Sequence, residues 1–442
     1  MGRDAHTEVV GSMGLYPRED LQEYLQRIGE ELAATSERPD LPWTFRVLDE
    51  DVVNAFALPG GFIYMTRGIM AHLESEAELA GILGHEIGHV TARHSVNRMS
   101  RAQLAQLGLG LGMILAPDLQ RFQGLAGASL QLLFLKFSRD DERESDMLGV
   151  RYMSQTGYEP TELAGVMEML GRVSAAHGGG GPPEWLSTHP NPSNREERIR
   201  EMAREAEVTG PSSEVDRESY IQRLDGLVYG QDPRQGFFRQ GHFYHPGLAF
   251  QMNFPRGWPT ANLDQSVQAV SPDEDAIVAL TLSEERVPED ALRTFLAQEG
   301  LEGGTASREP VNGLPAARAD FRVNTEQGIL EGRVVFLRYG DNTFRLLGYA
   351  PESRWDARRD AVSGTLTSFR PLEDSRYLDV EPARLEIVTL RSSMSLRRLL
   401  EQRGATEWEE DVRLLNRLDG NPTLEAGRMM KIPVGGRLPG GD

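Results

Sequence analysis

The segment His85-Glu86-Ile87-Gly88-His89 places two histidines and one carboxylate at a spacing that suits a metal site. Residues four positions apart lie on one face of a helix, so His85 and His89 can direct two imidazole nitrogens at one ion. Glu86 follows His85 directly, where its carboxylate can reach a water molecule on that ion. Imidazole nitrogens suit Zn²⁺, and a site with an open fourth position is catalytic rather than structural. The alternative is an amphipathic helix whose histidines are incidental.

A third ligand has to come from elsewhere, and the acidic stretch that begins at Ser138 offers candidates. It opens a predicted helix in which Glu142 and Asp146 share one face. Glu142 could supply the missing ligand, and Asp146 could accept the outward N–H of a ligand histidine and orient it. Glu144 is the rival carboxylate, on a different face of the helix. The simpler interpretation is that charged residues at a helix start are solvated.

His189 and His94 are two further candidates for the metal site. His189 follows a Gly-rich loop and precedes Arg195 by six residues, so both side chains could reach into a cleft, although a surface histidine is the simpler interpretation. His94 lies five residues after His89. The metzincin pattern requires glycine three residues and histidine six residues after the second histidine, and Ala92 stands where the glycine should be. We therefore exclude His94 as a ligand.

The helix that carries the metal motif has to be rigid, so it needs a defined first residue and one buried face. Ser75 is its predicted N-cap, and Glu78, three residues later, would complete a capping box. A helix over residues 18–35 and a small sheet precede it. The predicted strands are Trp43–Val47, Val52–Leu58 and Phe62–Met65. An edge strand beside such a helix can pair with an extended peptide substrate, and a purely structural hairpin is the alternative.

Residues 102–137 form an apolar, glycine-interleaved stretch with two interpretations. It could be a mobile apolar flap for unfolded chains or a membrane surface, or it could be a buried helical hairpin. Neither of its apolar runs reaches the roughly 18 residues that a membrane-spanning helix needs, and no other part of the chain does.

Composition narrows the class of protein. A chain of 442 residues with a net charge of −20 predicts two to four domains and disfavours nucleic acid and anionic membrane surfaces as partners. The absence of cysteine fits the cytosol, and equally an oxidising bacterial envelope. The first residues lack the apolar core of a signal peptide. The protein is therefore expected to be cytoplasmic, or else a mature form restarted at methionine.

The chain divides by pattern into three predicted domains, which cover residues 1–230, 241–373 and 382–436. The second alternates strands and helices as an α+β domain and has no cluster of titratable groups, which indicates a binding or positioning module. The third reads as strand, helix, helix and strand. At under about 60 residues it should be marginal alone and lean on a neighbour.

Residues 10–205 resemble the zinc metallopeptidase family of the CAAX prenyl protease, HtpX and BepA type, and in particular its soluble envelope branch of the BepA type. Four motifs carry the resemblance: Asn54-Ala-Phe-Ala-Leu-Pro-Gly-Gly, His85-Glu-Ile-Gly-His, Ser138-Arg-Asp-Asp-Glu-Arg-Glu-Ser-Asp, and Thr188-His-Pro with Arg195. It implies a mainly helical gluzincin-type domain with a small sheet, in which Glu142 is the third ligand. His189 and Arg195 would flank the zinc and stabilise the oxyanion, or His189 would be a fourth, gating ligand in a latent state. Ser145 departs from the alanine that the family usually carries.

The later segments have weaker resemblances. Residues 243–370 look like PsbP-type α+β domains, and residues 383–434 look like a LysM module. Ser392 and Ser393 stand where that module usually has Gly-Asp, which disfavours peptidoglycan binding but not the fold. The long membrane spans of the prenyl proteases are missing, so soluble protein substrates are expected. The architecture as a whole is similar to that of bacterial envelope proteases and favours the mature-form interpretation.

The sequence thus predicts a zinc-dependent endopeptidase with one Zn²⁺ per chain, held by His85, His89 and Glu142. Glu86 would act as general base and then acid. Misfolded or unassembled envelope proteins would be the substrates, in the periplasm or envelope, with the cytoplasm as the alternative. Outer-membrane or peptidoglycan association is a further expectation. The rival function is a latent protease that acts as a chaperone-like or cell-wall-associated binding factor.

Overall fold

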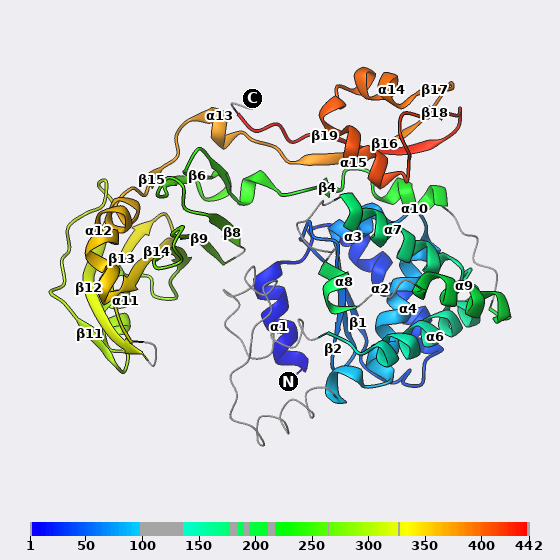
Figure 1. Cartoon of the computed structure of the whole chain (residues 1–442), viewed down its shortest axis with the longest axis horizontal. Helices are drawn as coiled ribbons and strands as arrows, with labels where there is room; N and C mark the ends of the chain where they lie inside the picture. Colours follow the sequence, from blue (N-terminus) through cyan, green and yellow to red (C-terminus); the bar gives the residue numbers. More distant parts are fainter. Residues whose placement is uncertain are drawn as a thin grey trace. The chain divides into compact units, whose positions relative to one another are not determined.

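A computed structural model describes residues 2–97, 136–176, 184–189, 194–210, 217–263, 265–325 and 328–439. The protein is α+β, as predicted, with helices and several sheets (Figure 1). The described residues form two compact units. The first contains the described chain up to Gln231 together with Pro382–Gly436, and the second contains Asp232–Glu381 and the described residues after Gly436. The third predicted segment therefore belongs to the same unit as the metal motif, while the division into three domains stays a prediction.

The described part of the first unit before residue 231 is mainly helical. Its helices are α1 (Gly2–Met13), α2 (Glu19–Ala34), α3 (Arg67–His72), α4 (Glu76–Thr91), α6 (Arg139–Thr156), α7 (Glu162–Ala176), α8 (Glu184–Thr188), α9 (Arg195–Glu205) and α10 (Arg217–Arg223). Helix α4 carries the metal motif and packs against α2, α6 and α7. Its side chains are buried from Ala77 to Val90, so it is a core helix rather than an amphipathic surface helix.

The start of α4 confirms one half of the predicted capping box and corrects the other. The Ser75 hydroxyl accepts a hydrogen bond from the N–H of Glu78 (3.1 Å), as an N-cap does. The Glu78 carboxylate does not return to Ser75. It accepts instead from the N–H of Glu74 (2.7 Å) and forms an ion pair with Arg417 (2.6 Å) from the C-terminal segment. Arg417 holds the Glu78 carboxylate because that carboxylate is buried and needs an opposite charge.

Two close approaches bring α6 against α4. A Cβ atom on Gly84 would lie 3.2 Å from the Cα of Gly149, and one on Gly88 would lie 3.1 Å from the Cα of Ser145. Side chains at these glycines would push the helices apart. The glycines therefore set the spacing at which carboxylates of α6 reach histidines of α4.

The small sheet lies beside the metal helix, with strand order β1-β3-β2. Its strands are β1 (Thr44–Leu48), β2 (Ala55–Leu58) and β3 (Phe62–Thr66). Strand β2 starts three residues later than predicted, since the Thr66 hydroxyl donates hydrogen bonds to the carbonyls of Val52 and Asn54. Strand β2 forms one edge of this sheet, which is the placement that pairing with a peptide requires.

The C-terminal segment of the first unit has the predicted order of strand, helix, helix and strand. Its main elements are β16 (Ala383–Thr389), α14 (Leu396–Arg403), α15 (Glu409–Leu415) and β19 (Met429–Gly435), with the short pair β17 (Met394–Ser395) and β18 (Thr423–Leu424). Strand β16 pairs with β19 and also with β4 (Val228–Tyr229). Residues 228 and 229 thus join the sheet of the C-terminal segment as a short strand.

This segment leans on its neighbour, as its size predicted. The ammonium group of Lys431 is fully buried and donates hydrogen bonds to the carbonyls of Ala71 and Leu73, both at 2.8 Å. Burial lowers the pKa of Lys431 to about 7. Because Ala71 and Leu73 lie just before α4, the C-terminal segment supports the end of the metal helix that is farther from the histidines.

The second unit contains two antiparallel sheets. The larger has the order β11-β12-β13-β14-β10-β9-β8 and the smaller β15-β7-β6-β5. The strands are β5 (Phe237–Arg239), β6 (His242–His245), β7 (Phe250–Asn253), β8 (Thr260–Leu263), β9 (Ser266–Val270), β10 (Ile277–Leu282), β11 (Leu301–Gly303), β12 (Ala316–Thr325), β13 (Gly328–Tyr339), β14 (Asn342–Pro351) and β15 (Arg370–Pro371). The helices are α11 (Pro288–Leu296), α12 (Glu352–Leu366) and α13 (Ser375–Leu378).

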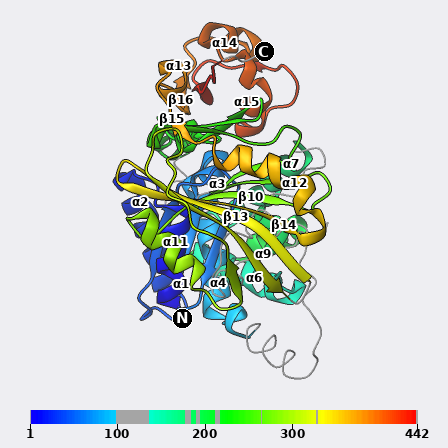
Figure 2. The same ribbon diagram turned by 90° about the vertical axis from the view of Figure 1, so that its left-hand side faces the viewer.

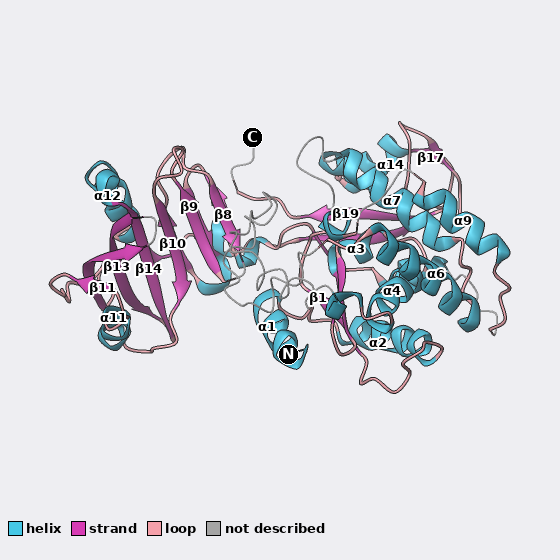
Figure 3. Ribbon diagram, turned by 60° about the horizontal axis from the view of Figure 1, so that its bottom comes forward, coloured by secondary structure: helices cyan, strands magenta, loops and turns pink. Residues whose placement is uncertain are grey.

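Helices α11 and α12 cover opposite faces of the larger sheet (Figures 2 and 3). Alternation along β13 explains this, since Val335 and Leu337 enter the core that contains Val362 of α12. Val334 and Phe336 enter the other core, with Phe295 of α11. The strands and helices of this unit agree with the α+β character predicted for residues 241–373.

The sequence predicts no membrane-spanning helix, and it leaves two interpretations of the apolar stretch at residues 102–137. No helix in the described part of the chain is long and apolar enough to cross a membrane. Most of the 102–137 stretch, up to residue 135, lies outside the described residues, so its two interpretations stay predictions. Phe137 is described, and its ring lies 3.8 Å from the ring of His89 between centroids.

Candidate metal centre

Four side chains from three parts of the first unit converge on one point. His85 and His89 come from α4, Glu142 from the first turns of α6, and His189 from the residue after α8. Each offers one ligand atom, and these atoms lie within 4.8 Å of one another. All four side chains are buried, so the interpretations of His189 as a surface histidine and of Glu142 as a solvated charge are wrong. Among the residues that the structure describes, no second group of this kind is found.

The distances within the group are short. The Nε2 atoms of His85 and His89 are 3.0 Å apart, and Nδ1 of His189 lies 3.3 Å from Nε2 of His85. Oε1 of Glu142 lies 2.9 Å from Nδ1 of His189 and 3.4 Å from Nε2 of His89. Glu144, the rival carboxylate, is half-exposed and points away to His94. Burial lowers the pKa of His89 well below its usual value, which keeps its imidazole neutral and able to bind a cation.

Arg195 and Asp146 form the layer behind these groups. The Arg195 guanidinium donates to both oxygens of Asp146, from Nε (2.9 Å) and Nη2 (2.7 Å), and its Nη1 lies 2.7 Å from Oε2 of Glu142. Asp146 also accepts at 3.0 Å from Nδ1 of His85. Burial raises the pKa of Glu142, but His189 and Arg195 outweigh it and hold that pKa well below its usual value. The spacing predicted that Asp146 could orient a ligand histidine, and the histidine that it contacts is His85.

Glu86 lies beside the group with one oxygen bound and one without a hydrogen-bond partner. Its Oε1 accepts a hydrogen bond from the indole N–H of Trp185 (3.2 Å). Its Oε2 is buried and has no partner among the described residues. Burial raises the pKa of the Glu86 carboxyl. Trp185 was not singled out from the sequence, and it also stacks on His189, with ring centroids 4.6 Å apart and planes 12° apart.

His94 is not in the group of ligand atoms, in agreement with its exclusion as a ligand. It lies directly behind His89 instead, with the two Nδ1 atoms 3.0 Å apart. The ligand pattern alone does not predict this contact between His94 and His89. Two features of the sequence could have indicated that His94 supports His89. A histidine follows just past the end of the metal helix, and Glu144 lies two residues after Glu142.

The side chains in this group fit a zinc ion. Imidazole nitrogens and one carboxylate oxygen are the N and O donors that Zn²⁺ takes in catalytic sites. Two neutral imidazole nitrogens that face each other at 3.0 Å repel through their lone pairs unless a proton or a cation lies between them. The anionic Glu142 beside them favours a cation. His85, His89 and Glu142 would hold the ion, with His189 within reach as a fourth ligand.

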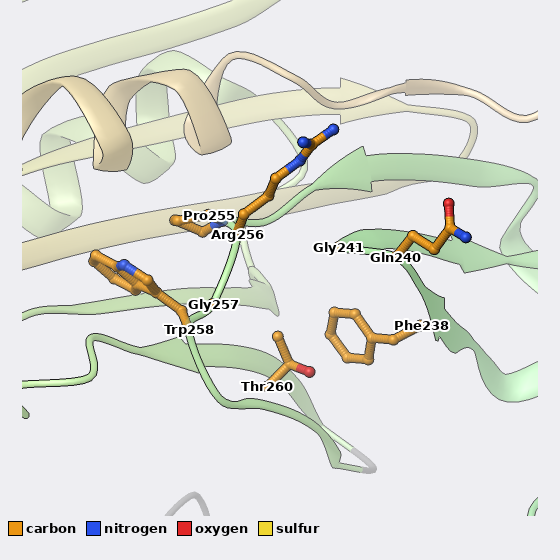
Figure 4. Close-up of a pocket in the computed structure, with 8 residues that line it drawn as sticks. All are labelled: Phe238, Gln240, Gly241, Pro255, Arg256, Gly257, Trp258 and Thr260. Atoms are coloured by element: carbon orange, nitrogen blue, oxygen red, sulfur yellow. The ribbon is translucent and has the colours of Figure 1, made fainter.

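The second unit contains an open cavity of about 530 Å³ (Figure 4). Phe238, Trp258 and Thr260 line it, and no carboxylate or histidine does.

Comparison with known proteins places the metal site in a family. The model of peptidase family M48 matches residues 19–203. The mitochondrial metalloendopeptidase OMA1 of Arabidopsis thaliana is 37% identical over 166 residues, which are 37% of this chain and 32% of that protein. The beta-barrel assembly-enhancing protease of Yersinia pestis is 30% identical over 221 residues, 48% of this chain and 45% of that protein. This chain therefore spans less than half of the length of either relative.

Among solved structures, the cyanobacterial PsbP protein of Synechocystis aligns with 29% of this chain and 91% of its own, at 13% identity and a TM-score of 0.26. This likeness is too weak to assign a fold, and the PsbP-like and LysM-like assignments stay predictions. The family match covers α4, α6, α8 and all but the last two residues of α9, and so every side chain of the site described above. Residues 19–203 are a zinc metallopeptidase domain of the M48 type.

Proposed function

We propose that the chain is a zinc-dependent endopeptidase in which His85, His89 and Glu142 hold one Zn²⁺ ion. The convergence of their ligand atoms within 4.8 Å, next to the Glu86 carboxylate, is the observation that supports this most. When bound there, Zn²⁺ supplies a Lewis acid that polarises a peptide carbonyl and lowers the pKa of a water.

Glu86 moves the proton in this proposal. Its Oε1 is held by the Trp185 indole, which leaves the unpartnered Oε2 to take a proton from the attacking water. The same oxygen then gives the proton to the leaving amine. A general base works best when its pKa lies near the working pH, and burial raises the pKa of Glu86 toward that range.

Arg195 fits a positioning role better than the oxyanion role. Its guanidinium is bound to Asp146 by two hydrogen bonds and paired with Glu142. It thereby fixes one proposed zinc ligand directly and a second, His85, through Asp146. His189 is then the remaining candidate from the sequence for contact with the oxyanion, unless it serves as the gate.

We expect His189 to be a gate, because its Nδ1 lies among the ligand atoms and its ring is stacked on Trp185. Replacing His189 by alanine should raise the rate of casein hydrolysis by about tenfold, which corresponds to about 1.4 kcal/mol of closure removed. Thr188→Ala is the control on the same turn and should leave the rate unchanged. A fall in kcat by a factor of about 10²–10³ for His189→Ala would assign it to the oxyanion instead.

Unfolded or unassembled proteins of a bacterial envelope are the proposed substrates. The name of the Yersinia relative, a beta-barrel assembly-enhancing protease, supports the envelope as the compartment. Strand β2 lies at the edge of its sheet and packs against α4. It could therefore pair with an extended segment of such a substrate. Folded proteins present few such segments, so unfolded chains should be preferred.

Hydrolysis of unfolded casein by the purified chain tests the proposal. Zinc-loaded protein should cleave internal peptide bonds, a chelator should stop cleavage, and added Zn²⁺ should restore it. The alternative is a latent protease that binds unfolded chains without cutting them, and the presence of His189 among the ligand atoms favours it. Zinc binding with no turnover by either the wild type or His189→Ala would support that alternative.

A further inference from the structure

The chain turns sharply at the end of α4. The helix ends at Thr91, Ala92 is its C-cap, and Arg93 follows with a φ of 60°, in the left-handed region. A large non-glycine side chain adopts this conformation at an energetic cost, so surrounding contacts must favour it. The turn brings the next residue, His94, back over His89, and the His94 side chain is buried.

A chain of side chains leads outward from His89. Its Nε2 faces the other ligand atoms, and its Nδ1 lies 3.0 Å from Nδ1 of His94. On the far side of the His94 ring, Nε2 lies 3.2 Å from Oε2 of Glu144. The Ser145 hydroxyl lies 3.4 Å from Nδ1 of His94, and Oδ1 of Asp141 lies 3.7 Å from its Nε2.

The carboxylates select the positions of the protons in this chain. Glu144 accepts only, so Nε2 of His94 carries a proton and donates to it. Nδ1 of a neutral His94 is then an acceptor, and it can receive the Nδ1–H of His89. That arrangement leaves the lone pair of His89 Nε2 directed at the other ligand atoms, which is the tautomer a metal ligand needs.

The same helix already supports the other histidine in this way. Asp146 of α6 lies 3.0 Å from Nδ1 of His85. We propose that Glu144 and His94 are the matching positioning residues for His89, so that α6 holds both histidines of α4 as well as supplying Glu142. This inference rests on the proposed zinc-binding role of His89. Glu144 is half-exposed, so its contribution should be smaller than that of the buried His94.

Zinc affinity is the direct test, with three variants and one control. His94→Leu removes the acceptor, His94→Asn keeps an oxygen near the place of Nδ1, and Glu144→Gln keeps the shape but not the charge. Asp140→Asn changes an exposed carboxylate on the same helix and should have no effect. Competition with a chromogenic chelator gives the dissociation constant of zinc, and thermal unfolding of the zinc-free protein reports structural damage.

We expect His94→Leu to weaken zinc binding by about 10–100-fold, as loss of a ligand's hydrogen-bond partner does elsewhere. His94→Asn should recover most of that loss, and Glu144→Gln should lose less than His94→Leu. In ¹⁵N spectra of the histidine side chains, the protected Nδ1–H signal of His89 should disappear in His94→Leu and persist in His94→Asn. The zinc-free proteins should unfold at similar temperatures.

Unchanged zinc affinity in His94→Leu would overturn the inference, and so would equal losses in the Leu and Asn variants. If His94→Leu does not fold, His94→Asn and Glu144→Gln against Asp140→Asn decide the question by the same two measurements. Failure of the wild type to bind zinc would instead refute the proposed function. The two failures are therefore distinguishable, and neither depends on measured peptidase activity.

Discussion

Glu86→Gln should bind zinc as the wild type does and lose peptide-bond hydrolysis by a factor of about 10²–10⁴. Glutamine has the shape of glutamate, and its amide oxygen can still accept the hydrogen bond from the Trp185 indole. It cannot take a proton from water at neutral pH. The variant therefore removes proton transfer from the buried carboxylate and leaves the ligand atoms around it in place. The measurements are kcat/KM on unfolded casein and the zinc content of the purified protein.

The matched control is Glu76→Gln on the same helix. Glu76 accepts hydrogen bonds from the hydroxyls of Tyr24 (2.7 Å) and Tyr158 (2.8 Å), and it is not among the residues of the metal centre. Its replacement should leave hydrolysis close to the wild-type rate. Digestion of casein by Glu86→Gln at the wild-type rate would show that another group moves the proton.

Local pattern was enough to predict the two histidines and the carboxylates of the site. Helical spacing alone puts His85 with His89, and Glu142 with Asp146, because a helix face is defined by residues four apart. The choice of Glu142 over Glu144 needed the resemblance to known peptidases as well. Spacing could not decide it, because the choice depends on which face of α6 meets α4.

Local patterns of this kind could not predict contacts between residues that are far apart in the sequence. Nothing near Glu78 indicates that Arg417 will pair with it, and nothing near Ala71 indicates Lys431. Short or exposed strands such as β8 and β11 lack a buried alternation, so a local pattern cannot locate them. The contact between His94 and His89 was not predicted for another reason. The metzincin pattern tests whether His94 can bind the metal, and it does not test whether His94 can orient another histidine.

The contacts of Arg195 lead to the second large expected effect. Arg195→Met should lower the free energy of unfolding of the zinc-free protein by about 3–5 kcal/mol, as removal of one partner from a buried ion pair does. Methionine can fill much of the same space and can still pack on Trp185, over whose ring the guanidinium lies. The loss would therefore come from two buried carboxylates, Asp146 and Glu142, left without their cation. Chemical denaturation followed by tryptophan fluorescence measures it.

Arg198→Met is the matched control, since Arg198 is partly exposed and lies 3.8 Å from the same Asp146. Such a pair contributes about 0–1 kcal/mol, so the control should unfold nearly as the wild type does. A loss below about 1 kcal/mol for Arg195→Met would show that the buried carboxylates do not depend on Arg195.

The difference between Arg195→Met and the wild type should also depend on pH. In the wild type, burial raises the pKa of Asp146, but Arg195 and His85 outweigh it and lower that pKa. A carboxyl with a lowered folded pKa stabilises the protein above its unfolded pKa, and this contribution is lost as the pH falls through the folded value. Without Arg195, burial should raise the pKa values of both carboxyls, so the variant gains stability as they take up protons. The difference in unfolding free energy should therefore be largest near pH 7 and shrink toward pH 4. A difference that stays constant over this range would trace the loss to packing, and would leave the guanidinium open to the oxyanion role.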